Sequence, residues 1–192
     1  SIAAVDGSRL VAITPGMRKE QVAGAFTKAL AWNAKQKLEF LTATPNSLLQ
    51  LSEGSFAPGI YPIALGTTPA EARMLVSDRF YKNVVSHYGT TTLNIVPLNQ
   101  ALTIASLIER EKGGNDDMRV ISGIIWNRLF IGMNLQIDAT LQYVKANGGT
   151  TKNWWPAAVS GDKYRASPYN TYLYKGLPPT PMGKGSSCAR GK

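Results

Sequence analysis

The chain has 192 residues, of which 44% are hydrophobic, a composition typical of a globular protein with one core of ordinary size or two small ones. No apolar run approaches the roughly 20 residues that a membrane-spanning helix needs, and no signal-peptide pattern is present. The net charge of +9 favours anionic neighbours such as envelope surfaces. The basic residues are scattered and match no nucleic-acid-binding motif, so we expect no nucleic-acid partner.

The cysteine and histidine content limits the chemistry further. The single cysteine, Cys188, excludes an internal disulfide, and the single histidine, His87, argues against a zinc cluster or a Ser-His-Asp triad. We expect His87 to lie on the surface at a helix end, where a cation is favourable. No metal and no cofactor is predicted.

The first part of the chain is typical of a small α/β unit. Its pattern predicts a strand at 9–13, a turn at 14–16, and helices at 17–32 and 35–42. From Pro45 the sequence becomes irregular. Residues 52–66 then mix aromatic residues with glycine and proline, as an ordered loop or short strands would.

Two further helices are indicated by apolar periodicity and by capping residues. Thr68 and Pro69 begin a helix that runs to about His87. Its expected buried face is formed by Ala72, Leu75, Val76 and Phe80. Asn115, Asp116 and Asp117 are expected to cap a helix at 118–130. The apolar residues of that helix predict a broad buried face, formed by Val120, Ile121, Ile124, Ile125 and Leu129.

Residues 102–112, LTIASLIEREK, end an apolar helix with two glutamates. At about 100° per residue, Glu111 falls within the stripe of Ile104 and Ile108, whereas Glu109 projects from the other side. We therefore expect Glu111 to be buried and Glu109 to be solvated. Burial would raise the pKa of the Glu111 carboxyl, as a general acid requires. The alternative is that Glu111 lies at a fraying helix end and is only partly buried.

Three later segments carry polar residues that packing does not explain: NRLFIGMNLQIDATLQY at 127–143, PYNTY at 168–172 and KGLPP at 175–179. Together with ASLIERE at 105–111, these motifs in this order resemble the catalytic domain of the endolytic murein transglycosylase family, also called MltG or YceG-like proteins. The resemblance is close over about residues 98–181. The N-terminal unit resembles the family's LysM-like subdomain more loosely.

The resemblance implies an α+β fold, with a small LysM-like unit at 1–44 and a mixed α/β catalytic domain of the YceG-like type at 45–182, followed by a flexible tail at 183–192. Because the family's catalytic domain normally continues further, we expect it to be truncated here at its C-terminal end. The family also implies action outside the cytoplasm, in the periplasm or at the outer face of the cytoplasmic membrane. A membrane anchor is expected in the full-length protein, outside this chain.

The activity that the resemblance implies is internal cleavage of peptidoglycan glycan strands between N-acetylmuramic acid and N-acetylglucosamine, which would terminate or trim nascent strands. The muramyl 6-hydroxyl attacks its own anomeric carbon and leaves a 1,6-anhydro end. One carboxyl can therefore serve where a glycoside hydrolase needs two. The family's catalytic glutamate matches Glu111. Glycan strands would be the substrate, and cell-wall synthases are candidate partners.

The matching motifs also imply a set of substrate-binding residues: Glu109, Asn127, Arg128, Gln136, Asp138, Tyr169, Asn170, Thr171 and Tyr172. Each has a structural alternative. Glu109 can pair with a neighbouring cation, and Asn127 and Arg128 can stabilise a helix end. Gln136 and Asp138 share one face of an extended segment, although Asp138 can equally cap the helix that follows.

The aromatic and proline-rich segments have two interpretations as well. Residues 169–172 suit sugar recognition, because aromatic faces cover pyranose rings while amides and hydroxyls meet their edges, but a buried turn uses the same residues. Trp154 and Trp155 fit either a glycan platform or a hydrophobic clasp. The GLPP segment at 176–179 is interpreted as a rigid loop that shapes a wall.

Two other functions remain open from the sequence. One is a peptidoglycan hydrolase that uses Glu111 with Asp138 as its partner. The other is a non-catalytic glycan-binding scaffold protein of the cell-wall machinery. Product mass separates the two enzymes, because anhydro ends weigh one water less than reducing ends.

Overall fold

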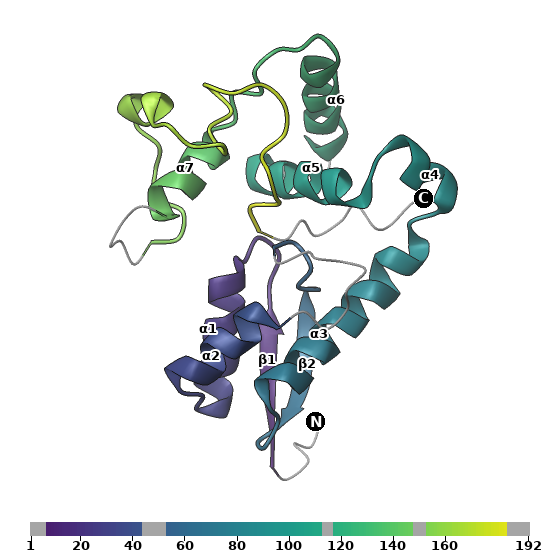
Figure 1. The fold of residues 1–192 in the computed structure, drawn as a ribbon, viewed down its shortest axis with the longest axis vertical. Helices are drawn as coiled ribbons and strands as arrows, with labels where there is room; N and C mark the ends of the chain where they lie inside the picture. The colour runs from purple at the N-terminus through teal and green to yellow at the C-terminus, as the bar shows by residue number, and fades with distance from the viewer. Residues whose placement is uncertain (1–6, 44–52, 113–116, 148–152, 184–192) are drawn as a thin grey trace.

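The structure is a computed structural model that describes residues 7–43, 53–112, 117–147 and 153–183. Figure 1 shows a mixed α/β molecule with two lobes. The N-terminal lobe comprises the described residues up to Asn83, and the C-terminal lobe comprises those from Leu98 onward. The expectation of a mixed α and β fold is confirmed.

A pair of antiparallel strands forms the centre of the N-terminal lobe. β1 (Ser8–Ile13) pairs with β2 (Gly59–Ala64), and Val11 lies opposite Tyr61. Alternation along each strand buries one face of the pair, to which Val11 and Tyr61 both belong, and exposes the other. The strand expected at 9–13 is confirmed, and the irregular stretch after Pro45 supplies its partner.

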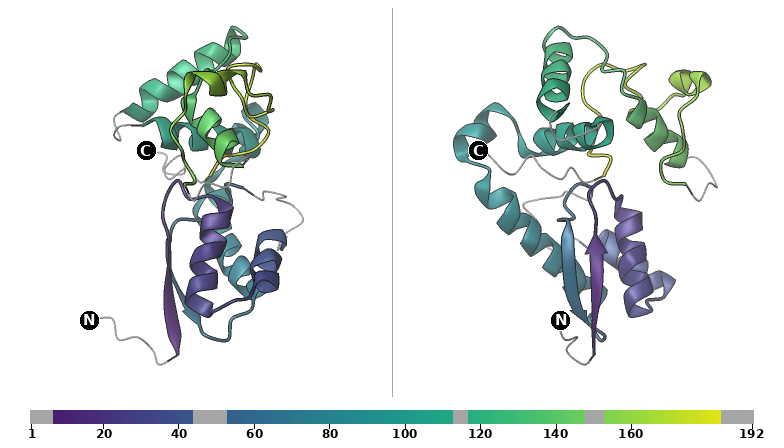
Figure 2. Two further views of the ribbon diagram at one scale, coloured as in Figure 1. Left: turned by 90° about the vertical axis from the view of Figure 1, so that its left-hand side faces the viewer. Right: turned by 180° about the vertical axis from the view of Figure 1, so that it is seen from behind.

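One helix packs directly on the strand pair, and a second packs on the far side of the first, as Figure 2 shows. α1 (Lys19–Leu30) follows the turn at residues 14–16, and α2 (Ala34–Thr42) begins with a capping box between Asn33 and Gln36. Both helices and the turn confirm the sequence prediction.

The core of this lobe is aromatic. The ring of Phe26 lies 5.9 Å from that of Trp32, 5.0 Å from that of Phe40 and 6.3 Å from that of Tyr61, centroid to centroid. Such offset and tilted contacts are favourable beyond the burial of area. Phe56 and Tyr61 belong to the same core, so the N-terminal core draws on residues on both sides of position 45.

The helix that links the lobes is α3 (Pro69–Asn83), and Thr68 and Glu71 form its capping box. Three of the four residues expected on its buried face are buried, but Leu75 is 47% exposed and was wrongly assigned to that face. A short 3-10 helix (Val85–His87) follows, in which His87 is exposed, as predicted. The short helix α4 (Thr90–Ile95) was not expected.

The C-terminal lobe is built from α5 (Leu98–Glu111), α6 (Asp117–Phe130) and α7 (Asp138–Asn147) around a second core. A second 3-10 helix (Ser160–Tyr164) and an irregular segment to residue 183 complete the lobe. The two long helices that the sequence predicts here, α5 and α6, are present.

The broad buried face expected for α6 is a correction. Ile125 is buried, but Val120 is 64% exposed and Ile124 is 49% exposed. Apolar periodicity predicts a helix and its stripe, but it does not show how much of the stripe another element covers.

The segment that ends the described chain closes the C-terminal lobe against the N-terminal one. Met182 is fully buried in the second core, and its backbone N–H donates to Ser106 Oγ at 3.1 Å. Gly54, with φ +83°, lies so close to Pro181 that an added Cβ would come within 2.9 Å of the proline ring.

The tail expected at 183–192 falls almost wholly outside the described residues. Within the described residues, no helix is long and apolar enough to cross a membrane.

Candidate active site

Glu111 is the last residue of α5 and points to the start of α7. Its Oε1 accepts a hydrogen bond from the backbone N–H of Ala139, the second residue of α7, at 3.4 Å. The side chain is exposed, so the burial expected for Glu111 is wrong. Unpaired N–H groups and the helix dipole make such a helix start favourable for a carboxylate or another anion.

Glu109, and not Glu111, is the shielded glutamate of this pair. Its side chain is only 11% exposed and pairs with Lys112 Nζ at 3.0 Å. The expectation that Glu109 is solvated is therefore wrong, whereas the alternative of a local ion pair is confirmed. The apolar stripe of α5 ends at Ile108, and the last helical turn lies beyond the second core.

Asp138 and Tyr172 lie beside Glu111. The Tyr172 hydroxyl donates to Asp138 Oδ1 at 2.6 Å. The pKa of Tyr172 is raised to about 12, chiefly by desolvation, and then by its bond to Asp138 and the negative charges of Asp138 and Glu111. The positive charge of Arg128 acts in the opposite direction. Four of the residues singled out from the sequence therefore share one electrostatic site.

Gln136, just before α7, and Asp138, the first residue of α7, are exposed, while Leu135 and Ile137 are buried, as the alternation predicts. Gln136 adopts φ +54°, a left-handed conformation that is rare for residues other than glycine. Such strain costs about 1 to 3 kcal/mol and concentrates at functional sites. The backbone before α7 is thus held in a shape that its own residues do not prefer.

Thr171 holds this segment in place. Its carbonyl accepts from Gln136 N at 3.0 Å, its Oγ1 accepts from Ile137 N at 3.0 Å, and its hydroxyl lies 3.0 Å from that of Thr140. Asn170 supports the same turn, since its Nδ2 donates to the carbonyls of Lys163 and Arg165 at 3.0 and 2.8 Å. Asn170 is 0% exposed and Thr171 is 2% exposed. The expectation that they bind sugar directly is corrected, because they shape the site from behind.

The remaining site residues occupy its margins. The ring of Tyr169 packs 4.8 Å from that of Tyr143, and its hydroxyl lies 2.7 Å from Thr180 Oγ1. Arg128 donates to the Leu135 carbonyl. Asn127 is exposed on α6, next to Arg128.

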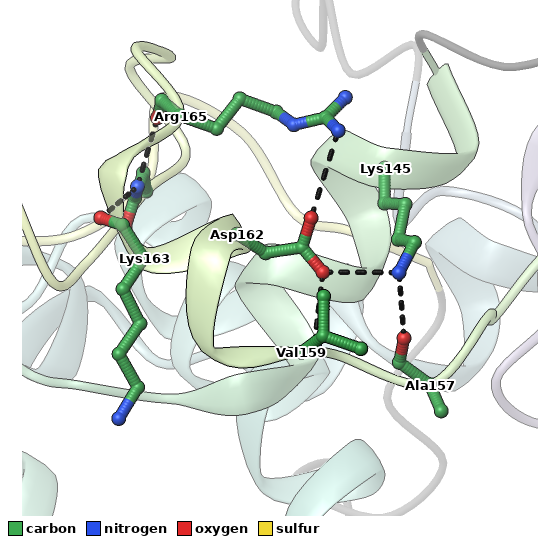
Figure 3. Close-up of polar contacts among 7 residues, drawn as sticks. Lys145, Ala157, Val159, Asp162, Lys163 and Arg165 are labelled. Atoms are coloured by element: carbon green, nitrogen blue, oxygen red, sulfur yellow. Dashed lines mark hydrogen bonds and ion pairs between the residues drawn. The ribbon is translucent and has the colours of Figure 1, made fainter.

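A second polar cluster, not found from the sequence, anchors the segment that carries residues 168–172. Asp162 is buried and accepts hydrogen bonds from Val159 N at 2.9 Å and Lys145 Nζ at 3.1 Å, with Arg165 Nη2 at 3.5 Å (Figure 3). The Val159 N–H bond, with the two cations, holds the pKa of Asp162 below its usual range. The sequence shows only a charged SGDKYR stretch, which is typical of a solvated loop.

A third cluster joins the lobes behind the site, and we call Arg18, Glu53, Arg110, Tyr143 and Trp155 the lobe joint. The guanidinium groups of Arg18 and Arg110 lie 4.6 and 4.0 Å from the ring centroid of Trp155. Arg18 is 1% exposed and donates to the Tyr143 carbonyl at 3.2 Å. Trp155 is half-buried and packs against the second core, which favours the clasp interpretation.

Glu53 is the acidic member of the lobe joint. It is 3% exposed, its Oε1 accepts from Lys19 N at 3.1 Å, and its Oε2 has no hydrogen-bond partner within the described residues. Burial raises the pKa of Glu53 to about 8. Across all the residues that the structure describes, no group of three His, Cys, Asp or Glu side chains is placed to hold a metal ion.

Comparisons with known proteins identify the family. The YceG-like family matches residues 2–189. Endolytic murein transglycosylases of Streptococcus pneumoniae D39 and Bacillus subtilis 168 are 31% and 28% identical, over 76% and 90% of this chain. The chain spans only 26% and 52% of the length of these two relatives. A crystal structure of a YceG-like protein from Listeria monocytogenes superposes with a TM-score of 0.77 at 22% identity, over 94% of this chain and 63% of that one. The chain belongs to the YceG-like family.

Proposed function

We propose that the protein is an endolytic lytic transglycosylase, which cleaves the bond between N-acetylmuramic acid and N-acetylglucosamine in peptidoglycan strands and leaves 1,6-anhydro-muramyl ends. The names of its relatives support the reaction class. The observation that carries the proposal is the exposed carboxyl of Glu111 at the start of α7, next to Asp138 and Tyr172.

Glu111 would act first as acid and then as base. Its proton passes to the glycosidic oxygen as the bond to the anomeric carbon breaks, and N-acetylglucosamine leaves with a free 4-hydroxyl. The muramyl 6-hydroxyl then bonds to that carbon and returns its proton to the Glu111 carboxylate. No water is consumed.

The neighbouring residues would bind and orient the strand. Asp138 and Gln136 present an acid and an amide on the exposed face beside Glu111. Tyr172 is half-buried and fixes the Asp138 carboxylate, so that Asp138 can accept from sugar hydroxyls in one orientation. Asn127, Arg128 and Glu109 would form the outer margin. Tyr169, Asn170 and Thr171 would act as positioning residues.

A hydrolase is the second candidate, because Glu111 contacts the residue directly after Asp138 and the two acids therefore flank one helix start. In a hydrolase Asp138 would activate a water as the second carboxylate. The bond from Tyr172 argues against this role, since it occupies one oxygen of the carboxylate that would serve as base.

The setting of the reaction is part of the same proposal. The N-terminal lobe has the order strand, helix, helix, strand, which supports a LysM-like unit that begins within residues 1–44 and is completed by β2. Its role would be to hold glycan near the catalytic domain that follows. Activity would take place outside the cytoplasm, on nascent strands, with cell-wall synthases as partners and a membrane anchor in the full-length protein.

The test is digestion of uncrosslinked glycan strands by the full chain, followed by mass spectrometry of the new ends. We expect anhydro ends from the parent protein and at least about a hundredfold slower cleavage by Glu111→Gln, the range for losing an acid–base group. Glu39→Gln is the matched control, because it makes the same chemical change at an exposed glutamate of the N-terminal lobe and should retain the parent activity.

Each outcome decides between the candidates. Cleavage by Glu111→Gln at the parent rate would refute the assignment of the catalytic acid. Ends heavier by one water would favour the hydrolase. Strand binding without cleavage by the parent would favour the scaffold function.

A further inference from the structure

A groove on the C-terminal lobe is not used by the proposed chemistry. It lies between the start of α5, the C-terminal half of α6 and the GLPP segment, with a volume of about 480 Å³. Figure 1 shows α6 standing over α5, with the last described segment passing beside both helices. We call this groove, lined chiefly by Asn99, Gln100, Trp126, Pro178 and Pro179, the α5–α6 groove.

The two walls of the groove differ in chemistry. Trp126 and the exposed Pro179 supply apolar surface, with the buried Pro178 beneath them. Trp126 is half-buried, and its ring lies 5.8 Å from that of the exposed Phe130. Asn99 and Gln100 are exposed, and no hydrogen bond within the described chain engages either side-chain amide. An aromatic face opposite free amides suits a pyranose ring that carries hydroxyl and N-acetyl groups.

The absence of charged residues from the described lining of the groove favours an uncharged ligand. The chain has a net charge of +9, yet every residue that lines the α5–α6 groove is uncharged. An anionic ligand such as a phosphate, or the acidic peptide carried by a muramyl unit, would have no ion partner there. A neutral N-acetylhexosamine would need none. A groove of this size lies within the usual range for small-molecule sites.

The groove lies far enough from Glu111 to hold a different sugar unit of the same glycan strand. Gln100 precedes Glu111 by three helical turns and lies on nearly the same side of α5, about 16 Å along its axis. A sugar held at Gln100 would therefore lie several units away from the bond at Glu111.

We propose that the α5–α6 groove binds a neutral N-acetylglucosamine unit of the glycan strand that is cut at Glu111. This inference rests on the proposed function for the identity of the strand. The groove would add affinity for long strands over short ones, because only a long strand reaches both places. Binding energy from such a remote unit also helps to position the reacting bond.

The direct test measures binding of an N-acetylglucosamine tetrasaccharide to the full chain in the Glu111→Gln background, by calorimetry. Adding Trp126→Leu should weaken binding about tenfold, as a loss of about 1.4 kcal/mol does. Trp154→Leu is the matched control, since Trp154 is also partly exposed but lies outside the groove, and it should leave binding unchanged. Binding to an uncharged groove should also change little between low and high salt.

A second variant guards against misfolding, because Trp126 also packs on the second core. Gln100→Ala alters only an exposed side chain and should weaken binding about fivefold, the effect of one hydrogen bond. The inference is overturned if the parent does not bind the tetrasaccharide, if both groove variants bind it as the parent does, or if Trp154→Leu weakens binding as much as Trp126→Leu.

The two proposals can fail separately. If the parent cleaves strands to anhydro ends and both groove variants bind normally, the groove assignment fails and the enzyme remains. If the groove variants lose binding while the parent cleaves nothing, the groove is supported and the enzymatic proposal fails.

Discussion

The buried carboxyl of Glu53 makes the stability of the protein depend on pH in an unusual direction. Its pKa rises from 4.5 to about 8, chiefly through burial, with the nearby charge of Glu20 adding to the shift. The hydrogen bond from Lys19 N and the positive charges of Lys19 and Arg18 offset only part of this effect. The folded protein therefore keeps a proton on Glu53 that the unfolded chain releases at lower pH.

The sign and size follow from this difference. Between pH 4.5 and about 8, the folded state binds more protons than the unfolded state, so the free energy of unfolding falls as pH rises. Each pH unit in this window is worth about 1.4 kcal/mol, which gives a loss of about 5 kcal/mol across the whole window. The contribution is fully present below pH 4.5 and is lost above about pH 8.

The assay is urea denaturation followed by circular dichroism, at pH values from 5 to 8, on the parent and on Glu53→Gln. A neutral amide has no proton to lose, so the variant should lack the downward slope, and its advantage over the parent should grow with pH. Glu71→Gln is a suitable control, because Glu71 is an exposed capping residue. Equal slopes in the parent and in Glu53→Gln would refute the reasoning.

Three further predictions concern packing and the site. Gly54→Ala should destabilise the protein by about 1 to 3 kcal/mol, because the added methyl group would meet Pro181 and the position has a positive φ. Gly123→Ala is the control: its added methyl group would meet nothing within 4 Å, so it should stabilise α6 slightly. Chemical denaturation measures the free energy of unfolding of both variants. Asp162→Asn should lower stability by about 1 to 3 kcal/mol by weakening the cluster of Figure 3, and an unchanged melting temperature would contradict that role. Gln136→Gly should keep stability within about 1 kcal/mol, because it relieves a strained φ, while strand cleavage falls; unchanged cleavage would show that the side chain is dispensable.

Local pattern predicted most of the helices because their signals lie within a few residues. The boundaries of α2 agree closely with its cap and periodicity, and those of α6 agree with its periodicity. Asn115 and Asp116, expected in the cap of α6, lie outside the described residues. α4 was missed because the sequence TTTLNI offers three β-branched threonines and too short a window for periodicity.

The sequence motifs indicated which residues form the candidate site, but they did not predict which of its two glutamates is exposed. Helical phase placed Glu111 in the apolar stripe, yet the second core ends one turn earlier, so the structure exposes Glu111 and shields Glu109. The lobe joint was also missed. Arg18 and Tyr143 are 125 residues apart, and no local pattern predicts that an arginine will meet so distant a backbone carbonyl.

The long separation of these contacts has a consequence for the order of folding. The N-terminal lobe is closed by contacts within residues 8–83, so it can form early and on its own. The second core instead needs Met182, which bonds Ser106 across 76 residues of chain. During synthesis α5 would therefore emerge with its apolar stripe uncovered and wait for the segment near residue 182. We expect the C-terminal lobe to fold last, and its incomplete form to be the species most prone to aggregate.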